Sequence, residues 1–378
     1  MKQQKEFNVI AGTFLIAYQT LLVAYLPFYF FYSPPGKDVV LATIVLMFLT
    51  GLSITAGYHR YFSHRSYKTH PVIEYILLFF GSMTIQGSAL RWSFDHRKHH
   101  AFVDTDRDPY SIKRGFWHAH FLWLLEKQEP IDPKVVADLK NNPRVMFQER
   151  HDILCMLGSN MLVWLFFGYI FDDMLGALVM IVGLRIFLVH HFTWFINSLA
   201  HTWGDRPFDI EQSAVNNFIL SFLTFGEGYH NYHHTFAHDY RNGVRWYHFD
   251  PTKWLIWVLN KAGLATNLRK VDALTIQKKM VIERRQILLE RIKTTWYVKK
   301  DELEHSVQEI SDRIVENMVK LHNLNMRYHQ FRKEKAENAL VEKLRHEMEQ
   351  LKDNFHSDWK KWKELSSSIM KLQPVPSS

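Results

Sequence analysis

The sequence is poor in cysteine, because its 378 residues include only Cys155. A single cysteine excludes a disulfide framework and a metal site built from thiolates. Histidine is the opposite case, with 22 residues. Imidazole is therefore the abundant soft ligand of this chain, and the composition fits a reducing compartment.

Charged residues are absent from residues 7–36 and scarce in three further apolar stretches. A helix needs roughly 20 apolar residues to cross the hydrocarbon core of a bilayer. Arg185 lies inside the fourth stretch, where a charge is costly, so we expect it to face protein or water and to form a structural ion pair. The membrane spans predicted from these stretches are residues 9–31, 39–57, 153–171 and 174–200.

Two shorter apolar runs, 75–90 and 213–226, are better explained as interfacial or protein-core helices. With four spans, residues 58–152 lie on the same face of the membrane as both termini. Of the 46 Lys and Arg residues, only Lys37 falls in an outer turn and only Arg185 falls within a span. This asymmetry makes the shared face the cytoplasmic one.

Glycine and proline are both absent from residues 264–373. Such a stretch, rich in Lys, Glu, Leu and Gln, is expected to be helical nearly throughout. Apolar residues recur every three or four positions over 307–331 and 340–362, which predicts a helical hairpin or a coiled coil. Charges of both signs are interspersed there, so we expect a solvated surface and no nucleic-acid binding.

Three short segments hold eight of the histidines. In the second and third, positions i, i+3 and i+4 share a helix face, so three imidazoles can point at a common place. In the first, positions i and i+5 are about 140° apart on an ideal helix and need a distorted helix end to converge. Eight imidazoles predict two metals side by side, and the spacing leaves iron, copper, zinc and nickel open. The histidines are His59 and His64, then His96, His99 and His100, then His230, His233 and His234.

Acidic residues flank the second and third segments. A carboxylate that accepts the second ring N–H of a ligand histidine fixes its tautomer and strengthens it as a donor. The alternatives for each carboxylate are a helix cap or a salt bridge. The residues predicted to brace histidines are Asp95, Asp104, Asp108 and Glu227.

Five motifs follow one another along the chain. They are His59-Arg60-x-x-x-His64, Trp92-x-x-Asp95-His96-Arg97-x-His99-His100, Asp108-Pro109, Asn197-Ser198-x-Ala200-His201 and Gly226-Glu227-Gly228-x-His230-Asn231-x-His233-His234-x-Phe236. Together they resemble the membrane-bound acyl-CoA Δ9 desaturases of the stearoyl-CoA type. The resemblance runs from about residue 8 to about residue 272.

The resemblance implies an all-α integral membrane fold. A four-helix transmembrane bundle would carry a cytoplasmic helical cap that holds a histidine-ligated diiron site. Residues 1–272 would form the desaturase domain, and residues 273–378 a cytoplasmic helical or coiled-coil tail. The protein would be a multi-pass protein of the endoplasmic reticulum or a bacterial inner membrane, with the active site and both termini cytoplasmic.

The resemblance also implies two Fe2+ ions, with O2 as co-substrate. In this family a ninth histidine follows the last span, which is His201 here, and the nearby Asn197 holds a metal-bound water. The implied ligands are His59, His64, His96, His99, His100, His201, His230, His233 and His234.

Implied substrate contacts lie at a bent acyl tunnel and at the carrier end. The residues expected there are Trp92, Gln86, Thr193 and Trp194 along the tunnel, and Arg114 and Lys127 near the carrier. Phe94 stands where the animal enzymes often carry Arg, and Ala237 and His238 replace a common Pro-Tyr. An acyl carrier other than coenzyme A therefore stays open.

The implied reaction introduces a cis-Δ9 double bond into a saturated C16 or C18 acyl-CoA. A methylene C–H bond has no acidity that a side chain could use, so no side chain is predicted to be catalytic and a redox metal must carry the chemistry. The alternatives are a related diiron membrane hydroxylase and a zinc-binding membrane scaffold.

Electrons are expected from another protein. The sequence has no His-Pro-Gly-Gly haem signature, no cysteines for an iron–sulfur cluster and no Gly-x-Gly-x-x-Gly fingerprint. A separate cytochrome b5 or ferredoxin with its reductase is implied as the donor. Membrane lipid and self-association through the tail are the further contacts expected.

Overall fold

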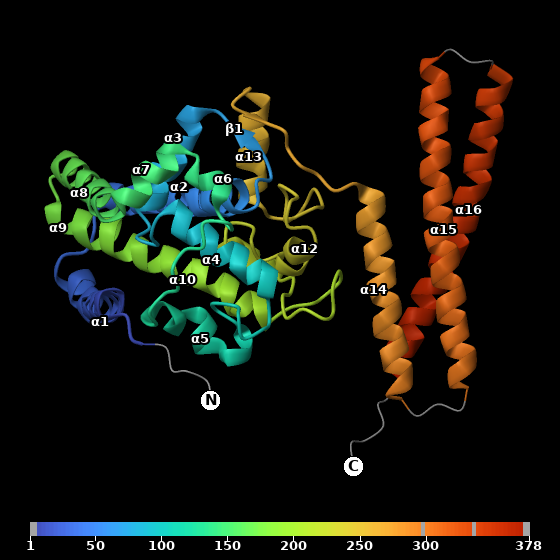
Figure 1. Ribbon diagram of the computed structural model, residues 1–378, viewed down its shortest axis with the longest axis horizontal. Coiled ribbons are helices and arrows are strands. Elements are labelled where there is room, and N and C mark those ends of the chain that lie inside the picture. Colours follow the sequence, from blue (N-terminus) through green and yellow to red (C-terminus); the bar gives the residue numbers. More distant parts are fainter. Residues whose placement is uncertain (1–5, 296–298, 335–337, 373–378) are drawn as a thin grey trace. The chain divides into compact units, whose positions relative to one another are not determined.

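A computed structural model describes residues 6–295, 299–334 and 338–372 (Figure 1). Within these ranges the chain is mostly helical, as predicted. The described strands form one short antiparallel pair, β1 (Lys68–Thr69) with β2 (Ala265–Thr266).

The chain divides into two compact units. The first unit comprises Met1–Arg206 and Glu211–Lys270, and the second comprises Pro207–Ile210 and Val271–Ser378. Each unit has a hydrophobic core of its own.

The first unit contains short and long helices of three kinds. Its α-helices are α1 (Val9–Tyr32), α2 (Lys37–Leu52), α3 (Pro71–Ser82), α4 (Ala89–Phe102), α5 (Phe116–His120), α6 (Ala137–Lys140), α7 (Pro143–Arg150), α8 (Asp152–Ile170), α9 (Met174–Gly176), α10 (Arg185–Asn197), α11 (Phe218–Leu223), α12 (His230–Thr235) and α13 (Pro251–Lys261). Two π-helices, η1 (Ser53–Ser63) and η4 (Ala177–Leu184), extend or interrupt the long helices. The 3-10 helices are η2 (Ile112–Arg114), η3 (Leu122–Leu125) and η5 (Leu199–His201).

Four helical segments are long and apolar enough to cross a membrane, which confirms the predicted number of spans. They are Val9–Tyr32, Lys37–Ser63, Asp152–Ile170 and Met174–His201. The second is six residues longer at its end than predicted, because η1 continues α2 through a polar sequence.

The four spans differ in burial. Within their most apolar windows, 17% and 22% of residues are buried in the first and third spans, against 56% in the second and fourth. We call the first and third the outer spans and the second and fourth the inner spans. Both inner spans contain a π-helix, whereas the outer spans are regular α-helices.

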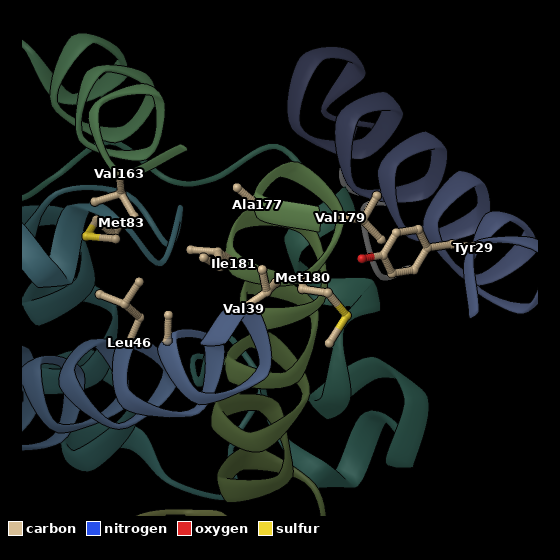
Figure 2. Packing of buried hydrophobic residues seen from close by; sticks show 10 residues of the cluster. Tyr29, Val39, Leu46, Met83, Val163, Ala177, Val179, Met180 and Ile181 are labelled. Carbon is tan, nitrogen blue, oxygen red and sulfur yellow. The ribbon is translucent and has the colours of Figure 1, made fainter. Parts of the chain in front are cut away.

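The core of the bundle gathers around η4. Figure 2 shows Ala177, Val179 and Ile181 of η4 among side chains from the other spans, including Tyr29 of α1 and Val163 of α8. Between helices that cross a bilayer, such side chains stabilise the contact by van der Waals packing, because lipid is as apolar as the helix interface.

The two shorter apolar runs do not form continuous helices. The run 75–90 begins inside α3, which ends at Ser82, and a turn with positive φ at Ile85 and Gly87 separates it from α4. In the run 213–226 only α11 is helical, over six residues. The expectation that neither run spans the membrane is confirmed, but the expectation of one helix in each is wrong.

Arg185 is fully buried, as its position predicted, but the predicted ion pair is wrong. Its guanidinium donates to the carbonyls of Ile181 and Met83 and to the amide oxygen of Asn160. No carboxylate pairs with Arg185 within the described part of the chain.

The second unit contains three helices, α14 (Ala273–Lys293), α15 (Lys300–Lys333) and α16 (Asn338–Lys371), shown in orange to red in Figure 1. The two predicted apolar stripes lie on α15 and α16, which pack against each other and against α14. Val307, Ile314 and Trp362 are among the buried residues between them. The coiled coil stays a prediction.

Candidate metal centre

The first histidine segment lies on the π-helix η1 and its last turn. The His64 N–H donates to the His59 carbonyl at 3.1 Å, a bond between residues five apart. Because a π-helix has this i→i+5 bonding, it brings the two histidines to one face. On a regular α-helix they would lie about 140° apart. The structure thus has the distorted helix end that convergence of this pair requires.

The second and third segments lie on α4 and α12. In both, the histidines at i and i+4 join one group and the histidine at i+3 joins another. Positions i and i+4 are roughly 40° apart on a helix, whereas i+3 and i+4 are roughly 100° apart. The prediction that the three imidazoles of one segment point at one place is therefore wrong. The pairs are His96 with His100 and His230 with His234, and the single residues are His99 and His233.

Nine histidines assemble into two groups, and they are the nine that the resemblance implied as ligands. Within each group, one ring nitrogen from every histidine lies within 4.8 Å of the others. The group of five is His59, His64, His96, His100 and His233, and the group of four is His99, His201, His230 and His234.

Ring nitrogens within each group face one another at distances that suit a shared ion. The Nε2 atoms of His59 and His233 are 2.9 Å apart, and those of His230 and His234 are 3.1 Å apart. Two nitrogens about 2.1 Å from one ion and at right angles would be about 3.0 Å apart. The buried Nε2 of His201 has no hydrogen-bond partner among the described residues, which leaves its lone pair for an ion. The donor set therefore fits one metal in each group.

Glu227 lies directly behind the group of five. Its Oε2 is 3.0 Å from His59 Nδ1, and its Oε1 accepts from Arg60 Nη2 at 2.9 Å. Burial by itself raises the pKa of Glu227, but the neighbouring Arg60 charge and His59 hold that pKa below its ordinary value. Asp250 also pairs with Arg60, so the two buried carboxylates share one buried cation.

The preceding glycine permits this arrangement. Gly226 has φ +99°, and a Cβ there would lie 2.6 Å from Asp250 Oδ1. A side chain at Gly226 would therefore push Asp250 away from Arg60 and disturb Glu227.

Asp108 braces the group of four. Its Oδ1 lies 2.9 Å from His99 Nδ1, and both side chains are at most 2% exposed. The nearby Tyr110 hydroxyl lies 3.2 Å from His96 Nδ1 in the other group. One short loop thus orients a ring in each group.

Asp104 acts on a histidine through a serine. Its carboxylate accepts from the Ser213 backbone N–H at 2.7 Å and from the Ser213 hydroxyl at 2.5 Å. The Ser213 Oγ lies 2.7 Å from His201 Nδ1. Sequence reasoning missed Ser213, because nothing in the local pattern marks a serine in a loop as a bridge.

Among the described residues, no hydrogen bond joins Asp95 to a histidine ring. Its two oxygens instead accept from Arg91 Nε at 2.8 Å and Nη2 at 2.7 Å. Burial raises the pKa of Asp95 to about 6, against the opposing charge of Arg91. Of the three roles considered for this carboxylate, a brace, a helix cap and a salt bridge, the structure has the salt bridge.

Six of the ligand rings outside the spans are held neutral. Burial, followed by the charges of neighbouring rings, lowers their pKa values well below the ordinary value. Neutral imidazole is the form that binds a metal. The six rings are His64, His96, His100, His230, His233 and His234.

A cavity of about 620 Å³ reaches the group of five, because His96 is one of its lining residues. The four residues predicted for the acyl tunnel all line this cavity, namely Trp92, Gln86, Thr193 and Trp194. Asn197 lines it too.

Three of these residues are joined by hydrogen bonds. Gln86 Nε2 donates to Thr193 Oγ1 at 3.1 Å, and Trp92 Nε1 donates to Gln86 Oε1 at 3.2 Å. Gln86 therefore links α10 to α4 across the cavity wall. Asn197 also lines a smaller pocket with His59 and His96.

Each predicted carrier contact is paired with a carboxylate. Arg114 pairs with Glu126, and the exposed Lys127 pairs with Glu6 at 2.9 Å. Neither cation lines the larger cavity, whereas Arg91 does. Sequence reasoning missed Arg91, although its i, i+4 spacing to Asp95 on a helix was a usable signal.

Comparison with known proteins gives one consistent result. A family model described as fatty acid desaturase matches residues 38–268. The chain is 42% identical over 277 residues to a probable acyl-CoA desaturase of Schizosaccharomyces pombe, which covers 72% of this chain and 58% of that protein. It is 39% identical over 267 residues to acyl-CoA desaturase 1 of Saccharomyces cerevisiae, which covers 70% and 52%.

A third relative is bacterial. The sn-2 palmitoyl-lipid 9-desaturase of Nostoc sp. is 36% identical over 245 residues, covering 63% of this chain and 82% of that protein. The chain thus spans a little over half the length of the two yeast relatives and most of the length of the bacterial one.

Proposed function

The chain belongs to the fatty acid desaturase family, and on that premise we propose that it is an O2-dependent membrane desaturase. Its reaction would introduce a cis-Δ9 double bond into a saturated C16 or C18 acyl chain carried by coenzyme A. The names of the yeast relatives support the carrier, and the name of the Nostoc relative supports position 9.

One observation carries the proposal: the histidine group of five lies beside a mostly apolar cavity of about 620 Å³. His96 belongs to the group of five and also lines the cavity. A chain in this cavity would therefore pass close to a metal held by that group.

Two iron ions are the proposed cofactors, and when bound they supply the oxidation by O2 that no side chain can perform. The residues of this chain would hold the ions, orient the ligand rings and shield the site. Nine imidazoles would bind the ions, while Glu227, Asp108 and the Asp104–Ser213 pair fix ring orientation. Asn197 would hold a water at the edge of the site.

The cavity would bind the acyl chain by burial, at about 0.8 kcal/mol for each CH2. Because neighbouring methylenes are chemically alike, only position can select the bond that reacts. The hydrogen-bonded Gln86 and Thr193 would form the polar bend at that bond, with Trp92 and Trp194 packing against the chain.

Arg91 is the cation at the cavity and the first candidate for the carrier end. Arg114 and Lys127 would contact the carrier beyond the cavity. A lipid-linked substrate is the second candidate, favoured by Phe94, which replaces a possible carrier contact, and by the name of the Nostoc relative.

A separate cytochrome b5 or ferredoxin, with its reductase, would deliver electrons at the face that we propose to be cytoplasmic. The chain has a formal net charge of +8, which would attract an acidic donor. With the donor limiting, turnover should fall steeply as salt is raised, and a flat response would contradict electrostatic steering.

The decisive experiment is expression in cells that lack their own Δ9 desaturase, followed by mass analysis of the fatty acids. The proposal predicts C16 or C18 products two mass units lighter than the substrate, with a cis double bond at position 9. Products sixteen units heavier would indicate a hydroxylase instead. No product, together with two tightly held zinc ions and no O2 consumption, would support a metal-binding scaffold.

A further inference from the structure

A buried polar cluster in the first unit lies outside the two histidine groups. It consists of Asn160 on α8 and of Arg185 and His190 on α10, and we call it the carbonyl clamp. Their exposed fractions are 6%, 0% and 1%. Arg185 is a charge inside an inner span, and its hydrogen-bond partners are neutral.

The clamp binds the end of α3. The Met83 carbonyl accepts from Arg185 Nη1 at 3.1 Å and from Asn160 Nδ2 at 3.2 Å. The next carbonyl, of Thr84, lies 2.6 Å from His190 Nε2. All three clamp residues therefore converge on two consecutive backbone oxygens.

The chemistry of a helix end explains why a cation lies here without a carboxylate. The last carbonyls of a helix have no donor within the helix and together carry a charge of about −0.5. Arg185 meets this partial charge directly through the Met83 carbonyl. In an apolar surrounding such carbonyls would cost several kcal/mol each if left unpaired.

The turn that follows carries Gln86 into the cavity wall. Ile85, directly before it, has φ +53°, a conformation that is strained for a β-branched residue, and Gly87 has φ +85°. Strained backbone persists only where its surroundings hold it. The clamp supplies that hold on the two residues before Ile85, and Gln86 then reaches Thr193.

We propose that Asn160, Arg185 and His190 are positioning residues that determine which carbon pair of the acyl chain reacts. They do so by fixing the turn that carries Gln86, and Gln86 sets the bend of the cavity. The inference rests on the proposed desaturase function. Asn160 and Arg185 do not line the cavity, so they act on the substrate only through this turn.

Two substitutions test the clamp by removing its donors: Arg185→Met, which keeps an unbranched side chain, and Asn160→Leu, which keeps the branching at Cγ. Ser159→Ala is the matched control, because Ser159 neighbours Asn160, is buried, and donates to Met156 of its own helix. Each variant is expressed in cells lacking a Δ9 desaturase, and the double-bond position is read by mass spectrometry of derivatised products.

The clamp account predicts one double-bond position for the wild type and for Ser159→Ala. Arg185→Met and Asn160→Leu should raise the fraction of double bonds at neighbouring carbons at least about tenfold. His190→Gln, which can still donate to the Thr84 carbonyl, should misplace fewer bonds than His190→Leu. Lower yield with an unchanged position in both clamp variants would show a purely structural role and overturn the proposal.

If a variant folds but is inactive, its thermal stabilisation by stearoyl-CoA tests the clamp instead. With wild-type metal content, loss of the thermal stabilisation given by stearoyl-CoA supports the clamp, and retention of it contradicts the clamp. If the variants do not fold, the milder Arg185→Lys and Asn160→Asp replace them, and failure of both to fold overturns a positioning role. Absence of product from the wild type would instead contradict the desaturase function. The clamp could then still be tested by comparing how far stearoyl-CoA stabilises the wild type and the clamp variants.

Discussion

The outer and inner spans of the first unit are all apolar in sequence but differ in geometry. The outer spans, α1 and α8, are regular and mostly exposed at their surfaces, as lipid contact requires. The inner spans contain η1 and η4 and are more than half buried. A π-helix is rare and is frequently found at functional sites.

The distorted helical segments therefore lie on the inner spans. On the second span, η1 brings His59 and His64 into one group. The fourth span bears Arg185 and Thr193 and ends at His201. No described residue of the outer spans belongs to either histidine group, so among the spans only the inner pair contributes to these groups.

Removing a ligand at the end of an inner span should have the largest effect. His64→Ala and His201→Ala should each lower the metal content of the purified chain and reduce desaturation at least about a hundredfold. Cys155→Ala on the outer span α8 is the control and should retain both. Equal loss in the control, or full activity in both histidine variants, would break the contrast between the spans.

Removing a brace behind a ligand should have a smaller effect than removing the ligand. Asp108→Ala leaves His99 without its carboxylate, so metal retention against a chelator should weaken about 10–100-fold. Asp108→Asn keeps an oxygen acceptor and should weaken retention less. Asp152→Ala, at the start of α8, should not change retention, and an equal loss there would show that the effect is not local to the site.

Two glycine substitutions sharpen the comparison by packing alone. A Cβ at Gly51 on the second span would lie 2.2 Å from the Phe225 ring, whereas a Cβ at Gly158 on α8 has nothing within 4 Å. Gly51→Ala should destabilise the protein by about 1–3 kcal/mol. Gly158→Ala should be neutral or stabilise it by up to about 1 kcal/mol. Thermal unfolding in detergent measures both, and equal shifts would contradict the packing difference.

The sequence predicts the number of spans because lipid demands long apolar stretches that composition displays. It does not predict that the second span ends at Ser63, because the end of η1, residues 58–63, mixes polar and aromatic residues and has no apolar run. Likewise the run 75–90 reads as one helix, since nothing in it except Gly87 marks the turn at Ile85. That turn depends on Arg185 and other residues distant in sequence.

The site was predictable to the level of residue type but not of grouping. Spacing identified histidines that belong together, yet the split of His99 from His100 depends on where a helix lies between two groups. Asp95 shows the same limit, because its distance from a histidine along the chain is short while its side chain turns to Arg91. The Asp104–Ser213 bridge crosses a loop that no periodicity describes.

We propose that nine histidines at the ends of the inner spans and on α4 and α12 hold two irons that oxidise an acyl chain. This proposal is tested by measuring bound metal and product in one sample of the purified, iron-loaded wild-type chain with a reductant, O2 and stearoyl-CoA. The account predicts about two irons per chain and an O2-dependent product two mass units lighter than stearate. Two zinc ions that iron does not displace, with no O2 consumption and no product, would contradict it.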